Sequence, residues 1–289
     1  MEIILFMLHK KKKLLISLFL VICIYESEAK TWQPSDEPDA LVAWWDASDS
    51  NTITITTGVS QWDDKSGNLR HLTQNTAVNQ PMYLTNAING YPVLMFTNTA
   101  SYYIQNTNTF HVGMIFFVAT ANTNSTASLA TLMGNNNDNA DIRRNNVTLF
   151  YRGLGQAQDA NDFVYPQSIQ YINGIFTNLF THNIPHIYSG QLGTGANGGG
   201  NYTTYTIGRA SSSLGRYWNG YVGEVILYST ALTAFNRQKI EGYLAWKWGL
   251  QSSLPTDHPY YSSAPTYRDK IIKSNNRLIK YGNNFIYAP

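Results

Sequence analysis

The sequence predicts an all-β protein, a sandwich of two antiparallel sheets with one short amphipathic helix near the C-terminus. Short apolar or alternating runs recur along the chain and are separated by Asn-Gly pairs and other turn signals. One segment, residues 234–248, has apolar residues at helical spacing instead. Because no repeat and no break in composition occurs between Trp32 and Pro259, we expect one large domain.

The predicted strands are short and follow one another closely. We expect them at Leu41–Ala47, Thr52–Thr56, Val93–Phe96, Tyr102–Ile104, Val112–Ala119, Val147–Tyr151, Ile169–Ile172, Ile175–Thr181, Thr203–Ile207 and Val222–Tyr228. Asn89-Gly90, Asn173-Gly174 and Asn219-Gly220 favour tight turns, because both residue types tolerate positive φ. Residues 135–146 and 190–200 are predicted loops, since neither stretch can bury enough apolar surface.

The predicted helix begins after Thr233, whose side chain can cap it, and ends before Gly249, a residue typical of the left-handed position that follows a helix. Ile240, Leu244 and Trp248 would lie on one face of it. This face should pack against a sheet.

Adjacent residues of a strand point to opposite faces, which bears on the tryptophan pair of the first strand. Trp44 and Trp45 cannot both point into the space between the sheets. One of the two is therefore predicted to be a surface aromatic.

The first 29 residues have the layout of a secretory signal peptide. Four lysines, Lys10 to Lys13, precede an apolar run from Leu14 to Tyr25, and Ala29 is a suitable cleavage position. The apolar run is shorter than the roughly 18 residues of a membrane-spanning helix. We expect cleavage before Lys30 and a secreted, extracellular or cell-surface protein, with the periplasm or a virion surface as further destinations; an uncleaved signal anchor is the alternative.

Charge and cysteine content exclude several classes of protein. The leader holds four lysines and three glutamates of the chain's 20 basic and 18 acidic residues, which leaves 16 against 15 and a net charge of +1. Such a balance is not typical of a nucleic-acid-binding protein. The leader also holds the one cysteine, Cys23, so the exported domain would have no disulfide. Residues 266–289 form a basic extension, either a solvated tail or a site for an anionic partner.

Four motifs together resemble one superfamily. They are WWDASDSNTI at Trp44–Ile53, QWDDKSGN at Gln61–Asn68, NGYPVLMF at Asn89–Phe96 and the stretch from GEVILYSTALT to EGYLAWKWGL at Gly223–Leu250. The chain is similar to the laminin G-like, concanavalin A-like jelly rolls of exported bacterial and viral proteins. This resemblance implies a jelly-roll domain over residues 30–265. It leaves the activity open, because such domains serve as lectins, carbohydrate-binding modules, adhesion domains, glycosidases and virion parts.

No catalytic motif is apparent in the sequence. Hydrolysis of a glycosidic bond requires two facing carboxylates. Glu224 lies in a predicted strand and Glu241 in the predicted helix, each without an acidic neighbour in sequence. We expect Glu224 to be bonded within the sheet, and Glu241 to face solvent or to pair with Arg237 one helical turn earlier. We therefore predict a protein that is not an enzyme.

Two aromatic pairs are the candidate ligand-binding residues. Tyrosine and tryptophan rings stack on sugar faces, and the chain has a surplus of tyrosines, including those of the pairs Tyr102-Tyr103 and Tyr217-Trp218. The alternative is that these rings pack within the strands, where aromatic residues are enriched.

Calcium is the one cofactor that the sequence suggests. Asp138 and Asp141, with neighbouring asparagines, offer clustered oxygen ligands in the loop at residues 135–146. Laminin G-like domains often hold calcium at a loop edge, which favours this site. Arg143 and Arg144 bring positive charge into the same loop and argue against it.

Three functions follow from these observations. The first is a non-catalytic recognition domain, a lectin or an adhesion domain, that binds carbohydrate or a cell-surface protein through its loops. The second is a structural component of a virion, fibre or cell envelope that associates with itself through the C-terminal extension. The third is a polysaccharide hydrolase, which the scattered acids argue against.

Overall fold

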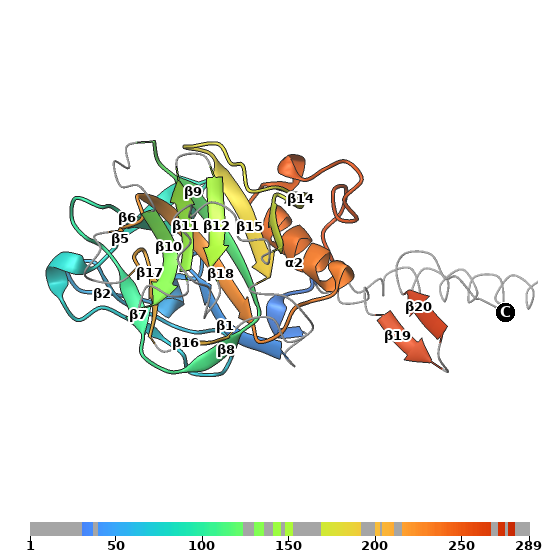
Figure 1. The fold of residues 1–289 in the computed structure, drawn as a ribbon, viewed down its shortest axis with the longest axis horizontal. Helices are drawn as coiled ribbons and strands as arrows, with labels where there is room; N and C mark the ends of the chain where they lie inside the picture. Colours follow the sequence, from blue (N-terminus) through green and yellow to red (C-terminus); the bar gives the residue numbers. More distant parts are fainter. Residues whose placement is uncertain are drawn as a thin grey trace, which may run out of the picture. The chain divides into compact units, whose positions relative to one another are not determined.

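The computed structural model describes residues 31–36, 40–123, 130–135, 141–145, 148–152, 169–191, 200–202, 204–210, 216–266, 271–274 and 277–280. The chain forms two compact units, one of residues 33–264 and one of residues 1–32 with 265–289. The larger unit contains two eight-stranded antiparallel sheets, shown in Figure 1. The predicted all-β sandwich with a helix near the C-terminus is therefore confirmed.

The first sheet is built around a long central strand, β18. Its order is β14-β13-β15-β9-β18-β6-β5, with β1 also paired to β18. The strands are β1 (Leu41–Asp46), β5 (Met82–Ile88), β6 (Tyr91–Phe96), β9 (Met114–Ala121), β13 (Ile169–Ile172), β14 (Ile175–Phe176), β15 (Pro185–Gln191) and β18 (Gly220–Tyr228). Along one edge of β18, β6 pairs with its beginning and β1 with its end. A bulge between Val222 and Glu224 separates these two parts.

The second sheet has the order β12-β11-β10-β17-β7-β4-β3-β2. Its strands are β2 (Ile53–Ile55), β3 (Val59–Trp62), β4 (Leu72–Thr73), β7 (Ile104–Asn106), β10 (Ala130–Asn135), β11 (Asp141–Asn145), β12 (Thr148–Arg152) and β17 (Tyr205–Ile207). Beside it, β8 (Phe110–Val112) pairs with β16 (Gly200–Tyr202). Short 3-10 turns lie at Pro34–Asp36, Ser50–Thr52, Ala77–Asn79 and Gln251–Ser253.

The core lies between the two sheets and is rich in aromatic side chains. Trp45, Phe117 and Tyr188 come from the first sheet, Trp62 and Tyr205 from the second, and all five have no exposed surface. Burial of one such side chain contributes about 1.5–3 kcal/mol. No cysteine occurs after residue 23, so the core is held together without disulfides.

Helix α2 (Ala234–Lys247) packs on β9 and β15 of the first sheet, on the side away from the core (Figure 1). The predicted caps are confirmed: the Asn236 N–H donates to the Thr233 hydroxyl at 3.3 Å, and Gly249 has φ of +66°. Leu244 and Trp248 are fully buried. The described residues contain no helix long and apolar enough to cross a membrane.

Replacing Thr233 by alanine should lower the free energy of unfolding by about 1 kcal/mol, because the helix loses a side-chain cap. Urea unfolding measures the difference. Thr57→Ala, at an exposed bend, is the control and should change the free energy by less than about 0.5 kcal/mol. Equal values for the two variants would show that the cap contributes nothing.

Two of the three predicted Asn-Gly turns are confirmed. Asn89-Gly90 joins β5 to β6 with φ of +48° and +89°, and Asn173-Gly174 joins β13 to β14 with φ of +52° and +76°. The prediction at Asn219-Gly220 was wrong, because Gly220 is instead the first residue of β18 and lies opposite Phe96 and Ala121.

Other differences have tertiary causes. Trp44 and Trp45 are both buried, 3% and 0% exposed, because Trp44 contacts Tyr243 of helix α2 on the outer side of the sheet. The prediction of a surface tryptophan was therefore wrong. Residues 135–146 are not all loop, since β11 pairs with β10 and β12. The strand predicted at residues 175–181 ends at Phe176.

In the smaller unit, Thr31 and Thr266 form an antiparallel bridge, and the Trp32 N–H donates to the Pro265 carbonyl oxygen at 3.3 Å. Strands β19 (Ile271–Ser274) and β20 (Arg277–Lys280) form a two-stranded hairpin. The sequence predicts short strands in the C-terminal extension at NRLIKYG and NFIYAP. Strand β20 lies within the first of these stretches, and the second lies outside the described residues.

Candidate functional site

Three of the four candidate aromatic residues gather around one arginine at an end of the second sheet. Strands β7 and β17 are antiparallel neighbours, with Ile104 opposite Ile207. Tyr102 and Tyr103, which precede β7, therefore lie beside Arg209, which follows β17. Arg209 also forms an antiparallel bridge with Tyr217. We name Tyr102, Tyr103, Arg209 and Tyr217 the arginine–tyrosine rim.

Arg209 lies over a tyrosine ring. Its guanidinium carbon is 3.4 Å from the centre of the Tyr103 ring. The residue is 8% exposed, and its Nε is enclosed without a hydrogen-bond acceptor. Within the part of the chain that the structure describes, no carboxylate or carbonyl oxygen accepts from this guanidinium. A buried arginine normally has an acid partner.

The contact with Tyr103 contributes less free energy than an acid partner would have to supply. A desolvated cation–π contact contributes about 2 kcal/mol. Removing an ion from water costs several kcal/mol even after the protein relaxes. The Arg209 side chain is therefore held at a net cost in free energy, which an external acceptor would reduce.

The tyrosines of the rim are half-buried, so each residue keeps part of its surface in contact with solvent. The backbone of Tyr103 is fixed on both sides: its N–H donates to the Asn79 carbonyl oxygen at 3.1 Å, and its own carbonyl oxygen accepts from Gln74 Nε2 at 3.0 Å. Tyr102 packs partly against the core. These contacts fix the backbone that carries the Tyr103 ring and hold Tyr102 in place.

Trp218 has a different role from the one that the sequence suggested. Its indole is 0% exposed, and the Arg144 guanidinium carbon lies 5.7 Å from its ring. Its backbone N–H donates to the Gly208 carbonyl oxygen at 2.7 Å, which holds residues 216–218 against the end of β17. Because the indole offers no face to solvent, we do not include it among the ligand-binding groups.

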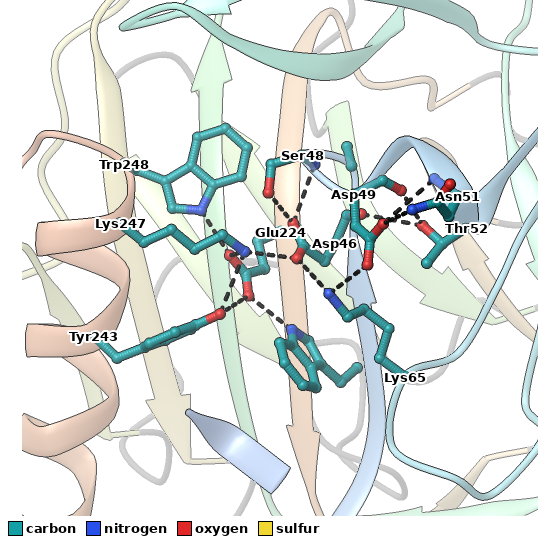
Figure 2. A network of polar contacts seen from close by, with 12 residues as sticks. Asp46, Ser48, Asp49, Asn51, Thr52, Lys65, Glu224, Tyr243, Lys247 and Trp248 are labelled. Atoms are coloured by element: carbon teal, nitrogen blue, oxygen red, sulfur yellow. Dashed lines mark hydrogen bonds and ion pairs between the residues drawn. The ribbon is translucent and has the colours of Figure 1, made fainter. Parts of the chain in front are cut away.

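A second cluster of polar side chains lies on the outer side of the first sheet, under helix α2. Asp46 of β1 and Glu224 of β18 are directly opposite each other and are 2% and 0% exposed. Lys247 of the helix bridges them, with Nζ 2.7 Å from Asp46 Oδ2 and 2.7 Å from Glu224 Oε2. Lys65 joins Asp46 to Asp49 at 2.9 Å each, as Figure 2 shows.

Both oxygens of Glu224 are fully engaged. Oε1 accepts from Trp44 Nε1 at 2.7 Å and from Tyr243 OH at 3.0 Å, while Oε2 accepts from Lys247 and from Trp248 Nε1 at 2.6 Å (Figure 2). A carboxylate that acts on a substrate needs a free oxygen within reach of it. Glu224 has none, and its contacts tie β18 to β1 and to the helix.

Charge and burial act in opposite directions on the two carboxyl groups. Burial raises the pKa of Glu224, and the nearby charge of Asp46 adds to this increase against the effect of Lys247. Burial alone would also raise the pKa of Asp46, but Lys247 and Lys65 together outweigh it and hold that pKa below its ordinary value. The two lysines therefore stabilise the ionised form of Asp46.

A third cluster surrounds Glu241, which is also 0% exposed. Arg237 Nη1 lies 2.6 Å and 2.7 Å from its two oxygens, as expected for an i,i+4 pair, and Ser189 Oγ donates to it at 2.5 Å. The pairing with Arg237 confirms one of the two alternatives predicted for Glu241. The guanidinium of Arg237 lies 3.6 Å from the centre of the Tyr171 ring.

The predicted calcium ligands are not described by the structure. Asp138 lies outside the described residues, and Asp141 belongs to β11 with a side chain that is also outside them. Among the described residues, no group of three or more His, Cys, Asp or Glu side chains could hold a metal ion. The calcium site remains a prediction.

The sequence did not reveal Arg209 or the pairing of Asp46 with Glu224. The sequence does contain a hint of this pair, because Asp46 in WWD and Glu224 in GEVIL are acids within strongly apolar strands. The signal for Arg209 is the lack of acids in the stretches of chain that surround it.

No protein-family model matches the chain, and no curated protein matches it. Solved structures do show likeness. Domain 4 of AbnA, a GH43 extracellular arabinanase from Geobacillus stearothermophilus, in complex with arabinotriose, is 15% identical over 68% of this chain and 95% of that one, with a TM-score of 0.39. The binding domain of Paraclostridial Mosquitocidal Protein 1 is 14% identical over 71% and 52%, with a TM-score of 0.41.

A sialidase from Trypanosoma rangeli, in complex with 2,3-difluorosialic acid as a covalent intermediate, is 14% identical over 68% of this chain and 32% of that one, with a TM-score of 0.33. At such identities and TM-scores, these likenesses do not tell what this chain binds.

Proposed function

We propose that this chain is an exported, non-catalytic recognition domain that binds carbohydrate through the arginine–tyrosine rim. The observation that carries the proposal is the convergence of Tyr102, Tyr103 and Tyr217, which are 115 residues apart at most, around Arg209 at one end of a sheet. Half-exposed rings suit the apolar face of a sugar, and the phenol hydroxyl groups can bond its hydroxyl groups.

The fixed backbone of Tyr103 supports this function. A ring that is already in place loses little conformational entropy on binding, so more of the contact energy contributes to affinity. The buried carboxylates support it indirectly, because Glu224 is fully occupied by hydrogen bonds and Asp46 by two lysines.

Replacing Tyr103 by alanine should weaken carbohydrate binding about tenfold, the effect of losing roughly 1–2 kcal/mol of ring contact. A glycan array identifies a ligand, and titration calorimetry measures its Kd for each variant. Tyr91→Ala is the matched control, because Tyr91 is also partly exposed, at 40%. It begins β6, whereas Phe96, which ends that strand about 17 Å away, lies against Gly208 beside Arg209. Tyr91→Ala should leave Kd unchanged.

Equal losses for the two variants would contradict the rim, and an array that stays blank with and without calcium would contradict carbohydrate binding as a whole. The same array in the presence of a chelator tests the calcium proposal. Binding that depends on calcium and is lost in Asp138→Asn or Asp141→Asn would place the ion in the segment at residues 135–146.

We further propose that the first 29 residues direct export and are removed by cleavage between Ala29 and Lys30. The composition of the first 29 residues supports this site. Expression of the full chain in a secreting host, followed by N-terminal sequencing of the released protein, should give Lys30 as its first residue. A protein that stays membrane-bound with its first residues intact would indicate a signal anchor.

A structural role is the second candidate, and the hairpin of β19 and β20 favours it. In the described residues these two strands pair only with each other. Isolated two-stranded hairpins are marginally stable in water, so this one would gain from a further strand of another chain. Light scattering of the full chain and of a chain ending at Pro265 separates the two candidates, since assembly that depends on residues 266–289 would support the structural role.

A further inference from the structure

Among the described residues, two buried arginines lie over tyrosine rings at nearly the same distance, and only one of the two is paired with an acid. Arg237 is 7% exposed, lies 3.6 Å from the Tyr171 ring centre and is paired with Glu241. Arg209 is 8% exposed and lies 3.4 Å from the Tyr103 ring centre. No acid occupies the place at Arg209 that Glu241 occupies at Arg237, within the described residues.

The sequence explains why Arg209 has no acid nearby. No Asp or Glu occurs between Asp64 and Asp138, or between Asp162 and Glu224. These two stretches supply the whole arginine–tyrosine rim. They also supply Arg216, whose carbonyl oxygen accepts from the Ala210 N–H at 3.4 Å, so a second arginine lies next to the first.

We propose that Arg209 binds an anionic group of the ligand, a carboxylate or a sulfate carried by a sugar. This inference rests on the proposed function and adds the chemical class of the ligand to it. A guanidinium keeps its charge at any physiological pH, and its planar fork matches two oxygens of such a group. The anion would occupy the position that Glu241 has beside Arg237.

The two terminal nitrogens of the Arg209 guanidinium are the accessible part of this side chain. The enclosed atom without an acceptor is Nε, whereas the two terminal nitrogens, which also have no acceptor in the described part of the chain, are not enclosed. A ligand that places a sugar ring on the half-exposed tyrosines would bring a substituent of that ring to these nitrogens. Rings and charge thus form one site.

Three polysaccharides test the proposal at 0.15 M salt: oligogalacturonate, which carries carboxylates, dextran sulfate, which carries sulfates, and neutral dextran. Arg209→Gln should weaken binding of at least one anionic probe about 30-fold, the loss expected for a charge-assisted bidentate contact. Arg209→Lys should weaken it less, because the charge remains and the fork is lost. Lys280→Gln removes an equal charge from the other compact unit and is the control.

Folding of the variants is measured by thermal unfolding. Because no oxygen of the described residues accepts a hydrogen bond from the Arg209 guanidinium, Arg209→Gln and Arg209→Met should keep the Tm of the unmodified protein or raise it, whereas Arg237→Gln should lower it. A fall in Tm for Arg209→Met as large as that for Arg237→Gln would show a hidden structural partner and overturn the proposal.

The binding results distinguish an anionic ligand at Arg209 from carbohydrate recognition in general. Binding of oligogalacturonate alone or of dextran sulfate alone, lost with Arg209, supports the proposal and identifies the anion. Binding of neutral sugars only, unaffected by Arg209→Gln, overturns the anionic ligand and leaves carbohydrate recognition intact. A loss with Lys280→Gln equal to that with Arg209→Gln assigns the anion to the basic extension and overturns the site, and no binding in any assay overturns both.

Discussion

Replacing Glu224 by alanine is expected to lower the free energy of unfolding by about 3–5 kcal/mol. The change leaves the indole N–H groups of Trp44 and Trp248 and the hydroxyl group of Tyr243 without their acceptor, in a region where water does not reach. Each buried donor without a partner costs about 1–3 kcal/mol. Since a domain of this kind is stable by only about 5–15 kcal/mol, much of its stability would be lost.

Urea unfolding followed by tryptophan fluorescence measures this change. Asp49→Ala is the control, because Asp49 belongs to the same network but its side chain is 31% exposed, and removing it should cost less than about 1 kcal/mol. Equal costs for the two variants would mean that Glu224 does not tie the sheet to the helix. Glu224→Gln keeps the shape of the side chain and loses its charge, so its cost should lie between the two.

The same variant tests the remaining alternative of a hydrolase. If Glu224 has a structural role only, Glu224→Gln should bind the same glycans with unchanged Kd at a temperature where it is folded. The contrary result is that the unmodified protein turns over a polysaccharide and Glu224→Gln does not. It would show that Lys247 and the indoles release the Glu224 carboxylate during a reaction.

The elements that sequence predicted well are those decided by local chemistry. Asn89-Gly90 and Asn173-Gly174 form tight turns because the positive φ that they need is intrinsic to the two residue types. The cap at Thr233 is equally local. The strands that escaped prediction, such as β11, are polar in sequence and owe their existence to neighbours on both sides.

The site depends on contacts that sequence spacing does not encode. Trp44 and Glu224 are 180 residues apart and meet through the pairing of β1 with β18. Tyr103 and Arg209 meet because β7 and β17 are neighbours. One of Trp44 and Trp45 was predicted to be a surface aromatic, and only the position of helix α2 shows that both sides of their strand are covered.

Replacing Gly220 by alanine is expected to destabilise the protein by about 4 kcal/mol or more, because a side chain there has no space. A Cβ at this residue would lie 1.9 Å from the Thr120 carbonyl oxygen and 2.9 Å from Trp218 Nε1, and φ is +154°. The glycine that sequence suggested for a turn is thus required for the close approach of β18 to β9.

Gly67→Ala separates the two causes of this destabilisation, the lack of space for a side chain and the positive φ. Gly67 has φ of +88° but nothing within 4 Å of the added Cβ, so alanine there should cost only the backbone strain, about 1–2 kcal/mol. Urea unfolding of both variants gives the difference, and a gap smaller than about 1 kcal/mol would contradict the close approach. Because residues 216–219 lead directly into Gly220, Gly220→Ala should also displace Tyr217 and weaken ligand binding, whereas Gly67→Ala should leave Kd unchanged.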